Sequence, residues 1–535
     1  MNTQSELQLG HGRNEVRPAW FQSLHQAMEQ LRSWPPGNQT LVWAFVALGV
    51  LTRLRQYVLD RSLWLDESFL ALNILHRSPV ELLKPLDYDQ AAPLGFLLLE
   101  KSAVMLLGTS ELVLRLIPFL CGVASVFLFA EVARRYLAPL AVPIAVGLFA
   151  ISDPLIYYSS EAKQYSGDVA ATLLLYLLLR PLIDQSQVDL ARRVTCAFAG
   201  AASVWFSQAT VFTLAALGLV ALWRAYREKD AGRFAWLTAI CATWASSLLV
   251  YYLVSLRAIH QNQNLLRYWY EAFAPLPPSL YADTSWALTS LANLVTYPFV
   301  SRHAQLGLES GIATAAVLGA LELNAMQKRR SLVLVLPSAL TLAAAAFQLY
   351  PFSGRLLLFL VPSIVLLVAS GFALVVNATG NTRPVIGILL IGFVCIAPLL
   401  TAGRNLIKGE FVEELKPAIK YVVARRVEGD SIYVYYASVS AFEYYKERGL
   451  IGAKNVIIGT GSWAGEWNSD NYKTDLDRLR GKKRVWLLFS HVYSRGRVND
   501  GQFYFRYLNS FGKCLDHLQA TDASAYLYDF STPSK

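Results

Sequence analysis

The strongest constraint on the fold is a series of apolar stretches that recur between Leu41 and Leu400. Many approach the ~20 residues that an α-helix needs to cross the hydrocarbon layer of a bilayer. Charged residues make up 16% of the 535-residue chain, against about 25% in an average soluble protein, and the mean hydropathy is +0.35. These features exclude an ordinary soluble enzyme and predict a polytopic membrane protein.

The apolar stretches and the basic clusters between them predict about 11 membrane-spanning helices. Lysine and arginine clusters mark cytoplasmic loops, and they alternate correctly only if 93–107, with Glu100 and Lys101 at its centre, lies at the outer interface without crossing. This topology places the N-terminus inside and everything after about residue 402 outside, so the working face is external. The stretches lie at about 40–58, 93–107, 111–133, 138–152, 165–182, 194–206, 209–223, 234–255, 311–326, 331–349, 355–376 and 384–401.

Three regions follow from this pattern. Residues 1–38 form a cytoplasmic segment with a short amphipathic surface helix, and residues 39–402 form the membrane bundle. In residues 403–535 helix-like and strand-like stretches alternate, which predicts a small extracytoplasmic α/β domain that serves as a binding or packing cap. Its expected strands lie at 431–436, 455–458, 485–489 and 525–528, and the amphipathic helix is marked by Trp20, Leu24, Met28 and Leu31.

Cysteine usage and charge exclude several function classes. Four of the five cysteines lie within apolar stretches and the fifth stands alone, so the sequence contains no CxxC motif or zinc knuckle. The net charge of +10 resides in clusters between apolar stretches, which indicates membrane topology and no nucleic-acid partner. The cysteines are Cys121, Cys196, Cys241, Cys395 and Cys514.

An acidic pair follows the first predicted span. Asp66 and Glu67 open an amphipathic stretch that runs to about Leu75, and the apolar residues Trp64 and Phe69 flank the pair. Acidic residues stabilise the N-terminus of a helix, so a capping and dipole role is one interpretation. The other is catalytic, because a carboxylate held at the membrane boundary with a raised pKa suits a general base for lipid-borne substrates.

The order of motifs around this pair resembles the start of the GT-C glycosyltransferases. Residues 63–68 read Leu-Trp-Leu-Asp-Glu-Ser, an interfacial stretch with Ala-Pro-Leu follows at 92–94, and residues 111–118 lead into a span. Within that superfamily the order is most similar to the branch of protein O-mannosyltransferases, aminoarabinose transferases and rhizobial lipopolysaccharide galacturonosyltransferases. The likeness is good over about 40–180 and looser to about 376.

The resemblance implies a bundle of membrane helices that accepts a polyprenyl phosphate sugar from the outer side of the membrane. It implies that Asp66 is the catalytic base, with Glu67 beside it, and that the sugar is transferred with inversion. The family often has His-Pro-Pro-Leu where this chain has Ala-Ala-Pro-Leu at 91–94. The family's usual contacts at that helix therefore do not carry over, whereas Asp66 is unaffected.

A second external loop carries further charged residues. Glu161, Lys163 and Tyr165 match the Glu-Ala-Arg and Tyr of the galacturonosyltransferase-like loop, and Asp168 follows one to two turns into the next span. The plainer interpretation is a solvated loop with an Asp-Pro turn. The resemblance favours acceptor binding by Glu161 and Tyr165, with Asp168 as a substitute for Glu161, and donor-phosphate binding by Lys163.

Two further motifs have a chemical and a structural interpretation. Arg355 opens a span at its external end, where it is either a snorkelling arginine or, as the family suggests, a donor-phosphate ligand that stabilises the leaving group. Asp87-Tyr88-Asp89 resembles a metal-binding Asp-x-Asp, but so short a match is weak and this branch generally works without metal. No cofactor is therefore expected.

The sequence thus predicts a multi-pass glycosyltransferase of a bacterial plasma (inner) membrane. Its partners are the bilayer, a polyprenyl phosphate sugar donor and a glycan, lipid or protein acceptor. A transporter or flippase for a lipid-linked or anionic substrate is the alternative, but transporters place charges at mid-span, whereas here they lie at span ends. A scaffold that merely displays the C-terminal domain leaves Asp66 and Glu67 unexplained.

Overall fold

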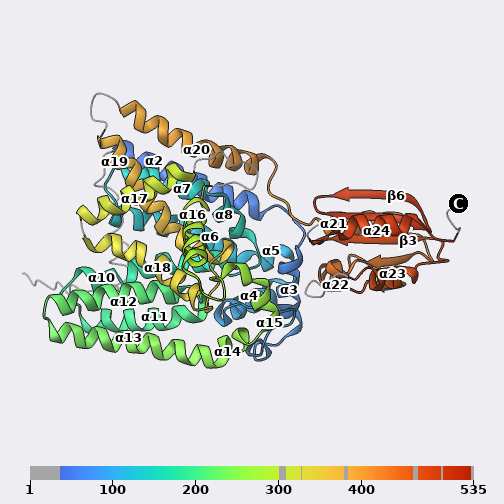
Figure 1. The fold of residues 1–535 in the computed structure, drawn as a ribbon, viewed down its shortest axis with the longest axis horizontal. Coiled ribbons are helices and arrows are strands. Elements are labelled where there is room, and N and C mark those ends of the chain that lie inside the picture. Colours follow the sequence, from blue (N-terminus) through green and yellow to red (C-terminus); the bar gives the residue numbers. More distant parts are fainter. Residues whose placement is uncertain are drawn as a thin grey trace, which may run out of the picture.

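The computed structural model describes residues 36–299, 309–326, 328–378, 384–461, 468–495 and 498–531. They form a large helical bundle followed by a small sheet-containing domain at the C-terminus (Figure 1). This arrangement confirms the predicted mainly helical fold with a small C-terminal α/β part. The amphipathic helix predicted around Trp20 to Leu31 lies outside the described residues.

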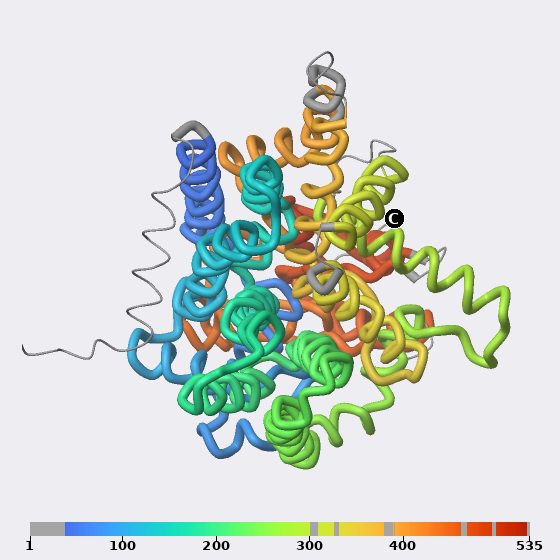
Figure 2. The backbone as a smooth tube through the Cα atoms, turned by 90° about the vertical axis from the view of Figure 1, so that its left-hand side faces the viewer, coloured from blue at the N-terminus to red at the C-terminus, as the bar shows by residue number. Residues whose placement is uncertain are grey.

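The predicted apolar stretches form the helices of the bundle. Viewed along the bundle, α11, α12 and α13 lie together on one side and α20 lies on the opposite side (Figure 2). The long helices are α2 (Pro36–Tyr57), α4 (Leu94–Leu107), α6 (Leu116–Tyr136), α7 (Ala141–Ile151), α9 (Tyr165–Leu178), α11 (Leu190–Phe206), α12 (Thr210–Arg227), α13 (Ala231–Tyr251), α17 (Glu309–Met326), α18 (Lys328–Ala346), α19 (Val361–Ala378) and α20 (Pro384–Ile407).

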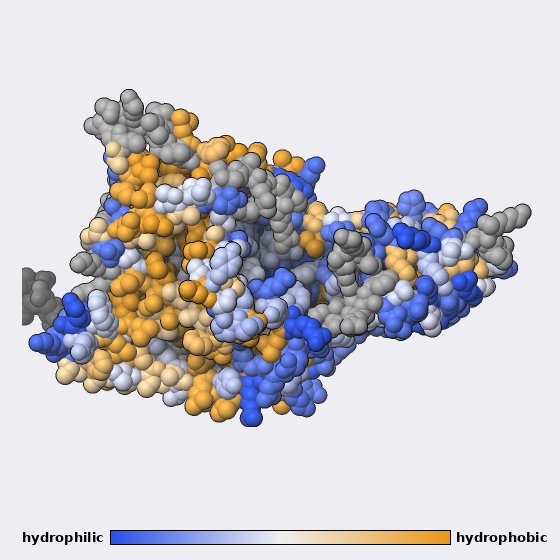
Figure 3. Space-filling view, in the orientation of Figure 1, coloured by the Kyte–Doolittle hydropathy of each residue, from blue (hydrophilic) through white to orange (hydrophobic). Residues whose placement is uncertain are grey.

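Four helical segments among the described residues are long and apolar enough to cross a membrane by length and composition alone: Leu116–Tyr136, Tyr165–Asp184, Ala231–His260 and Gly354–Ala378. The pair Ala141–Ile151 and Asp153–Ser160, bent by 58°, is a fifth if it counts as one span. The total of about 11 spans therefore stays a prediction. Figure 3 shows a largely apolar bundle surface and a more hydrophilic C-terminal domain.

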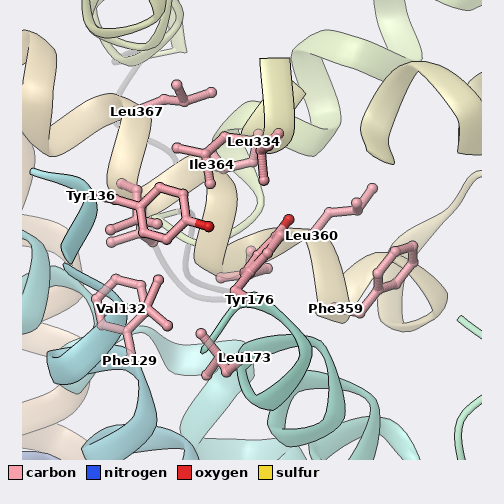
Figure 4. Packing of buried hydrophobic residues seen from close by; sticks show 14 of the residues in the cluster. Phe129, Val132, Tyr136, Leu173, Tyr176, Leu334, Phe359, Leu360, Ile364 and Leu367 are labelled. Carbon is pink, nitrogen blue, oxygen red and sulfur yellow. The ribbon is translucent and has the colours of Figure 1, made fainter. Parts of the chain in front are cut away.

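The core of the bundle is made where α6, α9 and α19 meet (Figure 4). Phe129 stacks on Phe149 with ring centroids 4.1 Å apart, and the Tyr176 hydroxyl lies 2.8 Å from the Ser363 hydroxyl, so this buried polar group is satisfied. Helices α17 and α19 approach so closely that a Cβ on Gly319 would collide with the backbone of Leu367. Small residues allow such close helix crossings.

Short helices form the end of the bundle next to the C-terminal domain (Figure 1). The connection between the predicted stretches 234–255 and 311–326 is partly helical, because it contains α14–α16. The short elements of this end are α3 (Leu65–His76), η1 (Glu81–Leu83), α5 (Glu111–Leu114), α8 (Asp153–Tyr157), η2 (Tyr158–Ser160), α14 (Arg257–His260), α15 (Gln263–Tyr268), η4 (Tyr270–Ala272) and η5 (Gly354–Leu360). The longer helix α16 (Leu280–Thr296) follows η4 in the chain.

The C-terminal domain is a five-stranded sheet in the order β2-β1-β3-β7-β6. Strands β2, β1 and β3 are parallel, and β7 and β6 are antiparallel. The sequence predicted β1, β2, β3 and β7 but missed β6 and α24. The elements are α21 (Leu415–Arg425), β1 (Ser431–Val434), α22 (Val439–Glu447), β2 (Val456–Ile458), α23 (Ser469–Asp477), β3 (Val485–Ser490), α24 (Asp500–Asn509), β6 (Lys513–Ala520) and β7 (Ala523–Asp529).

Candidate active site

Asp66 lies in the first turn of α3, between two cations that come from distant parts of the chain. One carboxylate oxygen, Oδ2, forms an ion pair with Nη2 of Arg355, and the other, Oδ1, lies 3.8 Å from Nζ of Lys163. The side chains of Asp66, Lys163 and Arg355 are 19%, 4% and 15% exposed. The fold thus gathers one predicted base and both predicted phosphate ligands in one partly enclosed cluster.

The two cations decide the charge state of Asp66. Burial raises the pKa of the Asp66 carboxyl, but attraction to Lys163 and Arg355 lowers it, and the net direction is below its usual value. The raised pKa expected from the membrane boundary is therefore wrong, because that expectation omitted the cations. Asp66 is a carboxylate at neutral pH.

Lys163 belongs to the loop between η2 and α9, and Gln90 holds its ammonium group in place. Its Nζ donates a hydrogen bond to Oε1 of Gln90 at 2.5 Å, and Nε2 of Gln90 lies 3.4 Å from Oδ1 of Asp66. Burial lowers the pKa of Lys163, and the neighbouring Asp66 opposes that shift. Gln90, which the sequence did not single out, therefore links the ammonium group to the carboxylate.

Arg355 enters the cluster from the start of η5. Gly354 precedes it with φ of +50°, a conformation that glycine adopts without strain. The guanidinium lies over three aromatic rings, at 5.3 Å from the centroid of Trp64, 5.7 Å from Tyr165 and 5.8 Å from Trp269. Such an aromatic enclosure holds a planar cation while its edge remains available for an oxyanion.

Glu67 does not share the environment of Asp66. Its carboxylate accepts hydrogen bonds from Nε and Nη2 of Arg115, at 2.8 and 2.5 Å, and both side chains are 1% exposed. Oε1 also accepts from the backbone N–H of Ala162 at 2.7 Å. Glu67 thereby joins α3 to the loop that carries Lys163, and it is not among the described residues that line the cavity beside Asp66.

The predicted acceptor-binding residues separate into two groups. Tyr165 lines the cavity beside Asp66, whereas Glu161 and Asp168 are buried and are not among the described residues that line it. Neither carboxylate oxygen of Glu161 has a hydrogen-bond partner within the structure. Burial, with the nearby charge of Glu67, raises the pKa of Glu161 to about 7. Glu161 is therefore a largely unpaired acid directly behind the cation cluster.

A cavity of about 690 Å³ opens from this cluster. At one end it presents the polar groups of Asp66, Gln90, Lys163 and Arg355. Its other walls are mainly apolar and come from α12, α13, α14, α18 and the π-helical stretch η3 (Tyr252–Leu256) between α13 and α14. These wall residues include Val211, Phe212, Ala245, Leu248, Leu249, Tyr252, Leu256, Ile259 and Ala344. The cavity combines a charged end with an apolar side, as an amphiphilic ligand requires.

The two aspartates of the Asp-x-Asp motif have different environments and different hydrogen-bonding or ion-pair partners. Asp89 lines the cavity and accepts hydrogen bonds from the side-chain amides of Asn262 and Asn264, at 2.8 and 3.1 Å. Asp87 is largely exposed and pairs with Arg77 at 3.0 Å. Over the described residues, no group of three or more His, Cys, Asp or Glu side chains is arranged to hold a metal ion.

The C-terminal domain holds the segment that carries Asp66 through hydrogen bonds to its backbone. The backbone N–H of Ser62 donates to Glu414 at 3.0 Å, that of Leu63 to the Tyr445 hydroxyl at 2.9 Å, and that of Leu65 to Glu413 at 2.9 Å. These bonds supply partners for backbone groups at and before the start of α3. No local motif in the sequence indicates them, because the partners lie about 350 residues away.

No model of a known protein family matches the sequence, and none of the curated proteins matches it either. The structure is similar to that of ArnT from Cupriavidus metallidurans bound to undecaprenyl phosphate, with a TM-score of 0.50 and 12% identity over 91% of this chain and 97% of that one. The apo state of the same ArnT gives a TM-score of 0.48 and 11% identity with the same coverage. AglB, the archaeal oligosaccharyltransferase from Archaeoglobus fulgidus, gives 0.43 and 13% over 91% of this chain and 74% of that one.

The likeness to ArnT in complex with undecaprenyl phosphate extends over nearly the whole of both chains. ArnT is an aminoarabinose transferase of the GT-C superfamily, the group that the motifs around Asp66 resemble. At 12% sequence identity the comparison shows the fold and nothing about function. The chain has the fold of the GT-C membrane glycosyltransferases.

Proposed function

We propose that the protein transfers a sugar from a polyprenyl phosphate sugar to an acceptor hydroxyl on the extracytoplasmic face, with Asp66 as general base. One observation carries the proposal: Asp66 lies between Lys163 and Arg355 at the charged end of a cavity with apolar walls. A donor of this class has a phosphodiester between a sugar and a long apolar chain. Its parts match the cations and the apolar walls, respectively.

The apolar side of the cavity suits the lipid part of the donor. Residues of α12, α13, α18 and η3 line it, including Leu248, Leu249 and Tyr252. The similarly folded ArnT was solved with undecaprenyl phosphate bound, which supports a lipid phosphate as the ligand of this fold. With the chain along these helices, the phosphate reaches Arg355 and Lys163, whose guanidinium and ammonium groups form charge-assisted hydrogen bonds to its oxygens.

The reaction is a single displacement at the anomeric carbon. Asp66 removes the proton of an acceptor hydroxyl, the acceptor oxygen forms a bond to the anomeric carbon, and the bond between that carbon and the phosphate oxygen breaks with inversion. The electron pair of the broken bond leaves with the polyprenyl phosphate. The phosphate group therefore carries one negative charge in the donor and two after release. Arg355 and Lys163 stabilise this developing charge, so their interaction is stronger in the transition state than with the donor.

The same cations tune Asp66 during the step. They keep the pKa of Asp66 below its usual value by direct attraction. When they turn toward the growing charge on the phosphate, they neutralise Asp66 less, and the carboxylate becomes a stronger base at the moment at which it accepts the proton. Glu67 then acts as a positioning residue, since its bonds to Arg115 and Ala162 hold α3 against the loop of Lys163.

The remaining parts of the site complete the proposal. Tyr165 contacts the acceptor or sugar in the cavity, and Glu161 and Asp168 support that wall from behind. About 11 spans with the N-terminus in the cytoplasm place this end of the bundle on the outer face of the plasma (inner) membrane. The reaction as written needs no metal.

The test compares the unaltered protein with Asp66→Asn, purified in detergent with lipid. Undecaprenyl phosphate carrying radiolabelled glucose, mannose, galactose, galacturonate or aminoarabinose is supplied with cell-envelope glycans and lipids as acceptors, and sugar transfer is measured. We expect transfer from one donor and a loss of roughly 10²- to 10⁴-fold in the variant. Asp89→Asn, which alters another carboxylate of the cavity wall, is the matched control and should retain most of the transfer.

Two outcomes count against the proposal. Transfer by folded Asp66→Asn at the unaltered rate removes Asp66 from the role of base. Absence of turnover with every donor, together with movement of a labelled lipid across proteoliposomes, establishes the alternative, a transporter or flippase for a lipid-linked substrate.

A further inference from the structure

The C-terminal domain contributes its own side chains to the cavity beside Asp66. His491 and Tyr493, from the segment that follows β3, line this cavity together with the membrane-domain residues. We propose that His491 and Tyr493 form the acceptor-binding wall of the active site and that the acceptor they bind is a carbohydrate. The proposal rests on the glycosyl transfer proposed above and goes beyond it by assigning the acceptor side and its chemical class.

His491 is held in a defined orientation by a residue that also holds α3. Its Nδ1 lies 2.5 Å from Oε1 of Glu413, while Oε2 of the same carboxylate accepts the backbone N–H of Leu65 at 2.9 Å. Leu65 directly precedes Asp66. One carboxylate thus sets the distance between the imidazole and the proposed base, and Nε2 is the ring nitrogen left for a ligand.

The position of His491 in the domain is one that α/β folds use for ligands. Strands β1 and β3 are parallel, and β3 ends at Ser490, so His491 lies at the carboxyl edge of the sheet. Ligands of open α/β sheets bind outside this edge. Here the edge adjoins the membrane domain, since Ser440 of α22 contacts Ser68 of α3 with hydroxyl oxygens 2.7 Å apart. The edge therefore faces the segment that carries Asp66.

The two ends of the cavity differ in what they can bind. Bundle helices provide the apolar wall, which fits the lipid of the donor, and Arg355 and Lys163 fit its phosphate. An acceptor hydroxyl must still reach Asp66. The C-terminal domain lies beyond α3 at the end of the bundle (Figure 1), and among its described residues His491 and Tyr493 line the cavity. The acceptor therefore approaches along the domain, while the lipid lies along the bundle.

The chemistry of this wall favours a sugar as the acceptor. The Tyr493 ring packs edge-on to His491, with centroids 4.8 Å apart, and is stacked parallel to Tyr436 at 6.0 Å. Tyrosine combines an apolar ring face with a polar hydroxyl. A pyranose has the complementary form, an apolar C–H face bordered by hydroxyls, and imidazole nitrogen and tyrosine hydroxyl can bond those hydroxyls directly.

The test measures acceptor and donor sides separately in the full-length protein. The acceptor probes are octyl glucoside, octyl galactoside and an acetylated serine peptide amide, and binding of a methyl glycoside is followed by saturation-transfer NMR. We expect His491→Phe and Tyr493→Ala each to raise the KM for the preferred octyl glycoside about tenfold or more, which corresponds to the loss of about 1.4 kcal/mol of binding. Undecaprenyl phosphate affinity should change less than about twofold in both variants.

Two controls make the result specific. His517→Phe alters an exposed histidine of β6 that stacks on Tyr526 and should change neither KM nor lipid affinity. Arg355→Gln should weaken undecaprenyl phosphate binding and leave the NMR signal of the methyl glycoside in place. His491→Gln, which keeps a hydrogen-bonding group, should recover part of the acceptor affinity that His491→Phe loses.

Each result has one meaning. If folded His491→Phe shows a lower kcat with an unchanged KM for the acceptor, His491 does not bind the acceptor, and the proposal is overturned. Efficient transfer to the serine peptide, with no transfer to either glycoside, overturns the carbohydrate assignment. If the unaltered protein turns over no donor, the glycosyl transfer fails, whereas glycoside binding that depends on His491 in the NMR experiment still supports a carbohydrate site at this wall.

Discussion

Asp66 and Arg355 form an ion pair although 289 residues separate them in the sequence. The pair joins the first turn of α3 to the start of η5 and thus connects an early and a late segment of the membrane domain at the end of the bundle next to the C-terminal domain. Lys163, from between them in the sequence, lies against the same carboxylate. One carboxylate and two cations thus lie together beside aromatic rings. This combination makes the region a candidate site for binding a phosphate and transferring a group from it.

Arg355→Lys tests whether the planar guanidinium is needed. Arg355 lies over the rings of Trp64, Tyr165 and Trp269, and an ammonium group cannot bind two phosphate oxygens side by side in that enclosure. We expect transfer to fall about 10- to 100-fold and undecaprenyl phosphate affinity to fall in parallel, because the lost bond is charge-assisted. Equilibrium binding of the lipid, with Arg425→Lys on the domain surface as the control, checks this; unchanged affinity would exclude Arg355 as a phosphate ligand.

Glu67→Gln tests whether Glu67 acts through structure. Its pairing with Arg115 is fully buried, and the substitution leaves the guanidinium without its counter-charge. Removing one partner of such a pair costs roughly 3–5 kcal/mol, so we expect a marked drop of the thermal midpoint in detergent. Glu131→Gln, which breaks the pairs with Arg134 and Arg135, serves as the control. A Glu67→Gln protein of normal stability that lacks only turnover would instead favour a direct catalytic role.

Gly319→Val tests the crossing of α17 and α19. A side chain at Gly319 would overlap the carbonyl group of Leu367, and one at Gly371 would overlap that of Ala315. The helices must separate to accommodate it, which costs packing that small residues otherwise provide. A Cβ at Gly311 of the same helix meets no atom of the described residues within 4 Å, so Gly311→Val is the matched control. We expect the first variant to lose monodisperse elution and the control to retain it; equal behaviour would refute the close crossing.

The helices of the bundle were predictable from the sequence because each is a continuous apolar stretch. Strand β6 was missed because most of its side chains are exposed, so it shows no apolar alternation that marks a half-buried strand. Helix α16 is absent from the predicted apolar stretches for a related reason, since residues such as Leu280 and Tyr281 lie exposed on its surface. Hydrophobic periodicity indicates which faces of an element are buried. Helices and strands whose side chains are mostly exposed therefore show no such pattern and are missed.

The site was predictable only in part. Asp66, Lys163 and Arg355 stood out because each charge lies at the end of an apolar stretch, where it is costly and therefore noticeable. Gln90 and His491 carry no such signal, because an amide and a single histidine are ordinary residues of polar loops. The low pKa of Asp66 was also beyond reach, since it depends on two cations brought together by the fold.

Glu161→Gln tests the unpaired acid behind the cluster through the pH dependence of stability. Burial raises the pKa of Glu161 from 4.5 to about 7, so the folded protein binds a proton that the unfolded chain releases. Its contribution to the free energy of unfolding is complete below about pH 4.5 and is lost as the pH rises toward and above 7. Glutamine is neutral at every pH, so Glu161→Gln should stabilise the protein increasingly between about pH 5 and about pH 8, by on the order of 1–3 kcal/mol at the upper end. Thermal midpoints in detergent across this range, with the exposed Glu428→Gln as the control, measure the difference; a Glu161→Gln shift that is constant with pH would show that Glu161 is ionised throughout, held by Lys163 and Arg355 despite its burial.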